Sequence, residues 1–403
     1  MKIIHQIFAS IALIGLAGCG SDSASDTTSA GDTANNNQER VIGISSNDIC
    51  QDNVNQSVDW NKLTTVNAVN LSEYKLFQNQ CDPTTNPSPR GLPYDMAVPL
   101  FTDYASKYRF VFVPTDQTAT YQSNEAFEFP VGSVLSKTFT LPLNTSDRGV
   151  SKEEVIETRL IIKRANGWAT LPYIWNADKS DALLSLIGGS TEVSVLHDSN
   201  ELNFDYGVPT NAECSKCHQY KPDGNPDLGF ISPIGPKARY LNSDYDYGSG
   251  DENQIAKWVS EGLLSGVPAS SSDIDVVPVF TDTTDINAIA PSQLEDFAEA
   301  WLDINCAHCH REEGGASNTN FNAEWDSPIA LATCNQPISY GGGDLSYIIT
   351  PGAADQSIMI QRMEAIPDGT GDQMPPLGRA LVHSEGTELI KAWLNSSTAT
   401  PCP

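Results

Sequence analysis

The sequence predicts an α+β protein, in which a β-rich, sandwich-like N-terminal part precedes mainly α-helical parts. Two observations indicate this fold class. Between residues 97 and 204 the apolar residues fall in short runs that are rich in β-branched and aromatic side chains and are bounded by Pro, Gly, Asn or Asp, which is typical of strands. After Val208 the apolar residues recur three or four positions apart, as they do along one face of a helix.

Several segments of the β-rich part have the composition of individual strands. Asn166-Gly167 favours a tight hairpin that leads into a strand at 168–171. This part contains no Ser-His-Asp arrangement, phosphate-binding loop or zinc-ligand spacing, so we expect a scaffold or a partner-binding module. The other expected strands are 108–113, 134–141, 157–163 and 192–196.

Three later segments have the helical pattern. In the clearest one, Pro291 and nearby acidic residues suit a first turn, and Leu294, Ala298 and Trp301 recur on one face. Ser384 is the expected N-cap of the last helix. The expected helices are 252–264, 291–304 and 385–394.

The N-terminus has the features of an export signal. Its apolar run from Ile3 to Ala17 is shorter than the ~20 residues that a membrane span needs. The run ends in Leu-Ala-Gly-Cys19, which resembles a bacterial lipobox and implies cleavage before Cys19 and lipidation of that residue. Because Gly20 rather than Asp follows, we expect a lipid anchor on the periplasmic side of the outer membrane. The alternative is an ordinary secretory signal with an incidental cysteine.

The formal net charge of -28 limits the partners of the chain. Nucleic acids and anionic membrane surfaces attract cationic faces, so we expect no nucleic-acid binding and no membrane contact except through the lipid. Such a charge permits attraction of a basic redox partner, although solubility in a salty medium also explains it.

Two five-residue motifs carry the chemistry: Cys-Ser-Lys-Cys-His at 214–218 and Cys-Ala-His-Cys-His at 306–310. Thiols three residues apart on a helical turn lie on one side and can both bond to the vinyl groups of one haem. The histidine that follows them can then ligate the iron. A disulfide-redox motif or a zinc site built from both pairs would not require that histidine twice, and we expect His308 to be a surface residue. The sequence therefore predicts two covalently bound haem c groups, held by Cys214, Cys217, His218, Cys306, Cys309 and His310.

Met374, in Gln-Met-Pro-Pro-Leu-Gly, is the expected sixth ligand of the second haem iron. Thioether sulfur is a soft ligand, and the two prolines stiffen the loop that presents it. A methionine that only fills core space is the alternative. The segment from the 291–304 helix to the closing helix resembles a class I cytochrome c domain, with its ligand loop in the usual place.

The first haem lacks a comparable downstream loop, because no methionine lies between His218 and Met359. Its candidate distal ligands are His197, Met96 and Lys237, of which we favour His197. An open, five-coordinate iron is a further alternative.

The remaining cysteines number four, an even count that favours disulfides in an oxidising compartment. Three pairings are possible, and free buried thiols are the alternative. Proximity in the chain favours Cys50–Cys81 and Cys334–Cys402.

Further segments, among them 99–104, 234–239, 302–310 and 374–379, resemble those of a poorly characterised family of bacterial di-haem c-type cytochrome lipoproteins. Similar haem modules occur fused to PQQ-dependent sugar dehydrogenases, which implies by analogy that such an enzyme donates electrons. The expected divisions are a signal peptide at 1–18, a disordered tether at 19–47, a β-rich domain at 48–208, a first haem-binding region at 209–285 and a class I cytochrome c-like domain at 286–403.

These observations favour a periplasmic, membrane-anchored electron carrier whose redox partner is a PQQ-dependent dehydrogenase or another cytochrome. One alternative is a di-haem peroxidase, which needs an open first haem and an acid–base residue such as Glu213 or His197. The other is a sugar- or partner-binding module in which the haems act as a relay. We assign no catalytic residue.

Overall fold

The computed structural model describes residues 41–325, 327, 332–338, 343–397 and 402. The expected signal peptide, Cys19 and the tether as far as residue 40 lie outside the described residues. Arg40–Pro403 form one compact unit. In the part of the chain that is described, no helix has the length and apolarity needed to cross a membrane.

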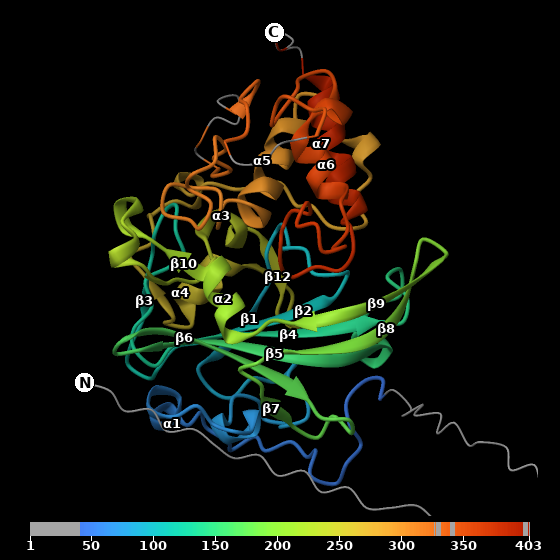
Figure 1. Cartoon of the computed structure of the whole chain (residues 1–403). Helices are drawn as coiled ribbons and strands as arrows, with labels where there is room; N and C mark the ends of the chain where they lie inside the picture. The colour runs from blue at the N-terminus through green and yellow to red at the C-terminus, as the bar shows by residue number, and fades with distance from the viewer. Residues whose placement is uncertain (1–40, 326, 328–331, 339–342, 398–401, 403) are drawn as a thin grey trace, which may run out of the picture. The chain divides into compact units, whose positions relative to one another are not determined.

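The main element is a six-stranded antiparallel sheet, whose long strands are green in Figure 1. Four of its strands were expected from the sequence, one of them as the second strand of the predicted hairpin. In that hairpin Arg164 pairs with Gly167 across the turn at Asn166. In spatial order the strands are β1 (Gly91–Tyr94), β2 (Ser106–Phe112), β4 (Val134–Pro142), β5 (Glu153–Arg164), β6 (Gly167–Trp175) and β7 (Ala182–Leu184).

Successive side chains of a strand point to opposite faces, so each face of this sheet has its own cover. On one face Phe110 and Phe112 pack against the N-terminal segment that contains α1 (Trp60–Thr65) and the 3-10 helix η1 (Leu71–Tyr74). On the other face Val111 of β2 packs against the helices α3 and α4. The bounds of these helices are Ala238–Leu241 and Gln254–Ser260.

A separate hairpin, β8 (Gly189–His197) with β9 (Asn200–Val208), packs against the same second face. Its Val195 and Tyr206 share a core with Phe139 and Leu141 of β4. The expected strand at 192–196 is therefore present, outside the main sheet.

Another core surrounds α5 (Leu294–Asn305) and α7 (Ser384–Ser396), together with α6 (Ile358–Glu364). Ala97 and Val98, from the loop after β1, are part of this core, so it joins the chain after β1 to the C-terminal helices. The divisions at 208/209 and 285/286 stay predictions.

The expectation of mainly α-helical cytochrome c-type domains after residue 208 is wrong, because the chain is mostly β with a six-stranded antiparallel sheet. The three expected helices do form, as α4, α5 and α7. Before and between these helices, the sequence after residue 208 is rich in Pro, Gly, Asp and Ser, which favour turns over helix. These segments form loops and short elements: α2 (Asn211–His218), β10 (Gln219–Tyr220), β11 (Phe230–Ile231), β12 (Asp244–Asp246), β13 (Asp251–Asn253), β14 (Leu264–Ser265) and the 3-10 helices η3 (Pro222–Gly224), η4 (Pro226–Leu228), η5 (Ser271–Asp273), η6 (Ile286–Ala288) and η8 (Ala354–Gln356).

Two elements of the β-rich part complete the fold, β3 (Ala119–Thr120) and the 3-10 helix η2 (Val150–Lys152). β3 pairs in parallel with β14, which ties the connection between β2 and β4 to the chain after α4. Two disulfides join Cys50 to Cys81, with sulfurs 1.97 Å apart, and Cys334 to Cys402, with sulfurs 2.12 Å apart. These are the pairs that proximity in the chain suggested.

Candidate functional site

The first Cys-x-x-Cys-His motif lies on the short helix α2. A capping box starts this helix: the Glu213 N–H donates to the Thr210 hydroxyl at 3.1 Å, and the Thr210 N–H donates to the Glu213 carboxylate at 2.9 Å. Cys214 and Cys217 are three positions apart in the helix, so their sulfurs lie on one side of it. The helix packs against β6 of the sheet.

His218 ends the helix and has one ring nitrogen free. Its Nδ1 lies 2.9 Å from the carbonyl oxygen of Ser232. A carbonyl only accepts, so Nδ1 carries the proton and Nε2 keeps its lone pair. Burial lowers the pKa of His218 to about 4, which keeps the ring neutral near pH 7. A neutral histidine with a free Nε2 is the form that ligates a metal.

The second motif begins where α5 ends. Cys306 is the C-cap of that helix, and the His310 N–H donates to the Cys306 carbonyl at 2.9 Å. His310 Nδ1 lies 3.0 Å from the Thr319 hydroxyl, which itself donates to the Ala316 carbonyl at 2.9 Å. The Thr319 oxygen therefore accepts the Nδ1 proton, and Nε2 of His310 is free as well. Burial also lowers the pKa of His310 to about 4.

The structure brings the two motifs together, which the sequence did not predict. Ligand atoms of Cys217, His308 and Cys309 all lie within 4.8 Å of one another. The nearness of the two thiols lowers the pKa of Cys217 and raises the pKa of Cys309. His308, expected on the surface, is half-buried beside these sulfurs.

One backbone hydrogen bond and one side-chain contact fix the position of one motif relative to the other. The Lys221 N–H donates to the Glu313 carbonyl at 2.8 Å. The Arg311 guanidinium lies 5.3 Å from the centre of the Tyr220 ring. Both contacts join the chain just after the first motif to the chain just after the second, so the two cysteine pairs are held as neighbours.

A cavity lies between the first motif and the second face of the sheet. Its lining includes Cys214, Cys217 and His218 and, from the sheet, apolar and basic side chains in alternation. A porphyrin is a flat apolar ring with two carboxylates on one edge, and a pocket of this composition suits it. The lining residues from the sheet that matter here are Arg109, Leu135, Lys137, Arg159, Ile161 and Leu171.

Met374 lies in a loop that Arg379 holds in place. The Arg379 side chain donates to the carbonyls of Met363, Ala365 and Met374, at 3.2, 2.7 and 3.1 Å, and the Met374 N–H donates to the Arg362 carbonyl at 2.8 Å. The half-buried Met374 is thereby fixed beside α6. Its ligation opposite His310 stays a prediction.

The three candidate distal ligands of the first haem have different surroundings. His197 stacks on Tyr104 at 4.1 Å, and its Nδ1 lies 2.9 Å from the Thr145 hydroxyl. The Lys237 ammonium lies 3.3 Å from a carboxylate oxygen of the buried Asp303. Among the described residues, Met96 alone of the three lines the cavity of the first motif. Ligation by His197 stays a prediction.

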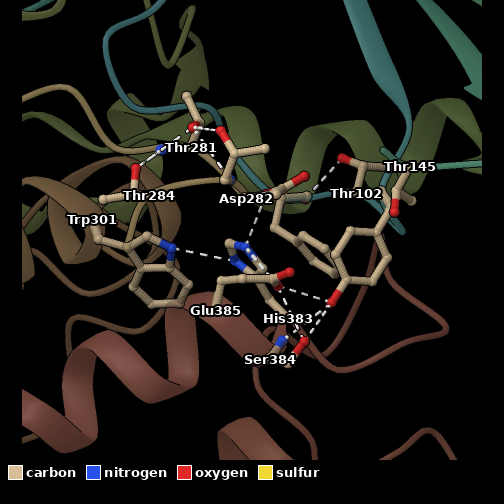
Figure 2. A network of polar contacts seen from close by, with 12 residues as sticks. Thr102, Thr145, Thr281, Asp282, Thr284, Trp301, His383, Ser384 and Glu385 are labelled. Carbon is tan, nitrogen blue, oxygen red and sulfur yellow. Dashed lines mark hydrogen bonds and ion pairs between the residues drawn. The ribbon is translucent and has the colours of Figure 1, made fainter. Parts of the chain in front are cut away.

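A polar network at the start of α7, shown in Figure 2, has the residue types of a metal site. His383 Nε2 lies 3.2 Å from Asp282 and 3.8 Å from Glu385. However, the indole N–H of Trp301 donates to His383 Nδ1 at 3.3 Å, so the proton of a neutral ring is on Nε2. Neither ring nitrogen of His383 is then free to bind a metal. We interpret the network as hydrogen bonding that ties α7 to the chain near residue 282.

Sequence reasoning missed the partners of the two histidines, Ser232 and Thr319, and the basic side chains of the cavity. Arg109, Lys137 and Arg159 lie in strands rich in apolar and hydroxyl-bearing residues, but no single strand marks them as the lining of a cavity. No family model, no curated protein and no solved structure matches this chain.

Proposed function

We propose that this protein is a di-haem c-type cytochrome that transfers electrons. Cys214 and Cys217 attach the first haem, and the pair at 306 and 309 attaches the second. The observation that carries the proposal is the state of the two motif histidines. His218 and His310 both donate Nδ1–H to a fixed acceptor and keep Nε2 free.

This arrangement is what an axial histidine needs. A hydrogen bond from Nδ1–H orients the ring, fixes the tautomer and makes Nε2 a better ligand. It occurs twice, with a carbonyl in one case and a hydroxyl in the other, although the two motifs lie on different elements. Two copies of the same arrangement, each directly after a Cys-x-x-Cys pair, favour haem over a zinc site shared by the motifs.

The closeness of Cys217 and Cys309 supports a transfer role. Each sulfur would bond to the edge of its own porphyrin, so the two porphyrin edges would be neighbours. Haem supplies reversible one-electron oxidation and reduction when it is bound. The chain contributes the fixed spacing through the Lys221–Glu313 backbone contact and the packing of Arg311 on Tyr220.

For the second haem we propose Met374 as the sixth ligand. The Arg379 side chain holds the Met374 loop through several carbonyls, so little ordering is needed to present the sulfur. A His/Met pair leaves the iron no open position, which suits transfer better than peroxide turnover. In the first site Glu213, a candidate acid–base residue of the peroxidase alternative, already accepts from the Thr210 N–H.

We further propose that the protein belongs to the bacterial di-haem cytochrome lipoproteins, anchored through Cys19 on the periplasmic side of the outer membrane. Its redox partner would be a PQQ-dependent dehydrogenase or another cytochrome. The net charge of -28 supports a partner with a basic docking face.

The test is the intact mass of protein produced with a working cytochrome c maturation system. We expect two haems above the polypeptide and its lipid, and one haem after Cys306→Ala with Cys309→Ala. Cys334→Ala with Cys402→Ala removes the same number of thiols from a disulfide and should retain both haems. Zinc without haem in the wild type would refute the proposal.

A further inference from the structure

Three basic residues form a row across neighbouring strands of the sheet. Arg109 of β2 lies opposite Lys137 of β4, and Lys137 lies opposite Arg159 of β5. We call these three residues the basic row. Like charges directly opposite each other destabilise a sheet, so the row requires anions to balance it.

Within the described part of the chain, acidic side chains form ion pairs with the two outer members of the row. Arg109 forms an ion pair with Asp95, and both carboxylate oxygens of Glu157 accept from Arg159. Glu157 also accepts from the Tyr206 hydroxyl at 2.8 Å, so its oxygens are already engaged.

Lys137, in the middle, forms no ion pair within the described residues, and the charge of Glu157 acts on it only from a distance. Its ammonium lies 5.0 Å from the centre of the Phe139 ring. Burial, together with the neighbouring Arg159, Arg109 and Lys107, pushes the pKa of Lys137 well below its usual value. A half-buried ammonium without a counter-ion is costly unless something else on that face is negative.

The row faces the first haem motif. All three side chains line the cavity that also contains Cys214 and His218. The open side of the row is therefore the space that the first haem would fill.

We propose that the basic row binds the propionate carboxylates of the first haem, with Lys137 as the central partner. This inference rests on the proposed function. Each propionate is a carboxylate, and charge-assisted hydrogen bonds to ammonium and guanidinium groups are the strong ones. The β-sheet is then one wall of the haem site, in addition to any role in binding a partner.

The experiment is a redox titration of the haem-loaded full chain with Lys137→Gln. Loss of a positive charge disfavours the gain of an electron, so the potential of the first haem should shift downward while that of the second is unchanged. The propionate bending band in resonance Raman spectra should shift as well, and Lys137→Arg should restore both readouts. The matched control is Lys163→Gln on β5, whose ammonium lies 5.2 Å from the Trp168 ring; it should leave both potentials unchanged.

Stability gives a second readout that separates a haem role from simple packing. If the row had no anion to bind, Lys137→Met would remove an uncompensated cation and leave the melting temperature equal or higher. The inference predicts a lower melting temperature for the haem-loaded variant. Two bound haems with unchanged potentials, Raman bands and stability would overturn this inference alone, whereas a wild type without haem would overturn the proposed function and this inference with it.

Discussion

The two haem motifs sit in different surroundings, although their sequences are nearly the same. The first lies on α2, a helix of eight residues with none buried, and it faces apolar and basic side chains of the sheet. The second follows α5, most of whose residues are buried against α6 and α7. The first motif therefore depends on a cap and on the sheet, and the second depends on a helical core.

This difference predicts how far the loss of stability caused by a substitution extends. A change in the core around α5 should lower the stability of the whole unit, because that core also contains residues from the loop after β1 and from α3. A change at the start of α2 should stay local, because few of its side chains are packed. The following substitutions test whether the two regions differ in this way.

The largest effect is expected from Asp303→Asn in α5. Asp303 is 1% exposed and accepts from Arg239 and from the Tyr240 hydroxyl, both at 2.7 Å, and it pairs with Lys237 at 3.3 Å. Its removal leaves two buried cations without a counter-ion, which costs about 3–5 kcal/mol. Denaturant unfolding measures the loss.

Glu295→Gln is the matched control for this substitution. Glu295 lies on the same helix but is exposed, so its change should alter the free energy of unfolding by less than about 0.5 kcal/mol. Equal effects of Asp303→Asn and Glu295→Gln would contradict the view that α5 is the centre of the second region.

The next effect concerns only the second haem. Met374→Ala should abolish the near-infrared sulfur-to-iron band of the ferric protein and lower one of the two reduction potentials, since thioether favours ferrous iron. Met363→Leu is the control, because Met363 is a buried core residue of the neighbouring α6. A band that survives Met374→Ala would show that another residue is the ligand.

Sequence analysis predicted local elements in both regions but not how the two motifs meet. The strands around Lys137 and the helix at 294–305 were predicted, because each has a local period of apolar residues. The prediction of mainly α-helical domains after residue 208 was wrong, because three correctly predicted helices were taken to represent the whole segment, including its loops. The motif cysteines and histidines were found from spacing alone. The meeting of Cys217 with Cys309 was not, since no local pattern encodes contacts between segments some 90 positions apart.

The basic row was missed for a related reason. Arg109, Lys137 and Arg159 each look like an ordinary polar position on the solvent face of a strand. Only the register of β2, β4 and β5 places them directly opposite each other and on a covered face. Register depends on the turns and on the partner strands, which single-segment patterns do not specify.

A pH-dependent effect is expected at the contact between the loop after β1 and the chain before α7. Asp103 is 2% exposed, accepts from the N–H groups of Ala380 and Leu381 at 2.8 Å, and has its pKa raised by burial to about 6. An acid whose pKa is higher in the folded state stabilises that state fully below its ordinary value of 3.8, and this stability is lost as pH rises through about 6.

Asp103→Asn should therefore raise the free energy of unfolding at pH 7 by up to about 2–3 kcal/mol and have little effect at pH 4. Asn keeps the side-chain oxygen that accepts both N–H groups and tolerates the positive φ of 47° at this position. Denaturant midpoints at the two pH values measure the difference. A variant that is less stable than the wild type at pH 7 would show that the carboxylate is needed in its charged form.

The smallest effect is expected at the cap of α2. Thr210→Ala removes the hydroxyl that accepts from the Glu213 N–H, which costs about 1 kcal/mol, whereas Thr210→Ser keeps it and should cost less. Because α2 buries no residue, this loss should fray the helix without unfolding the core around α5. Hydrogen exchange should then accelerate for the amides of 213–218 while those of α5 and α7 keep their protection. If the amides of α5 accelerated to the same extent, the two regions would unfold as one unit, and the different surroundings of the two motifs would not translate into separate stabilities.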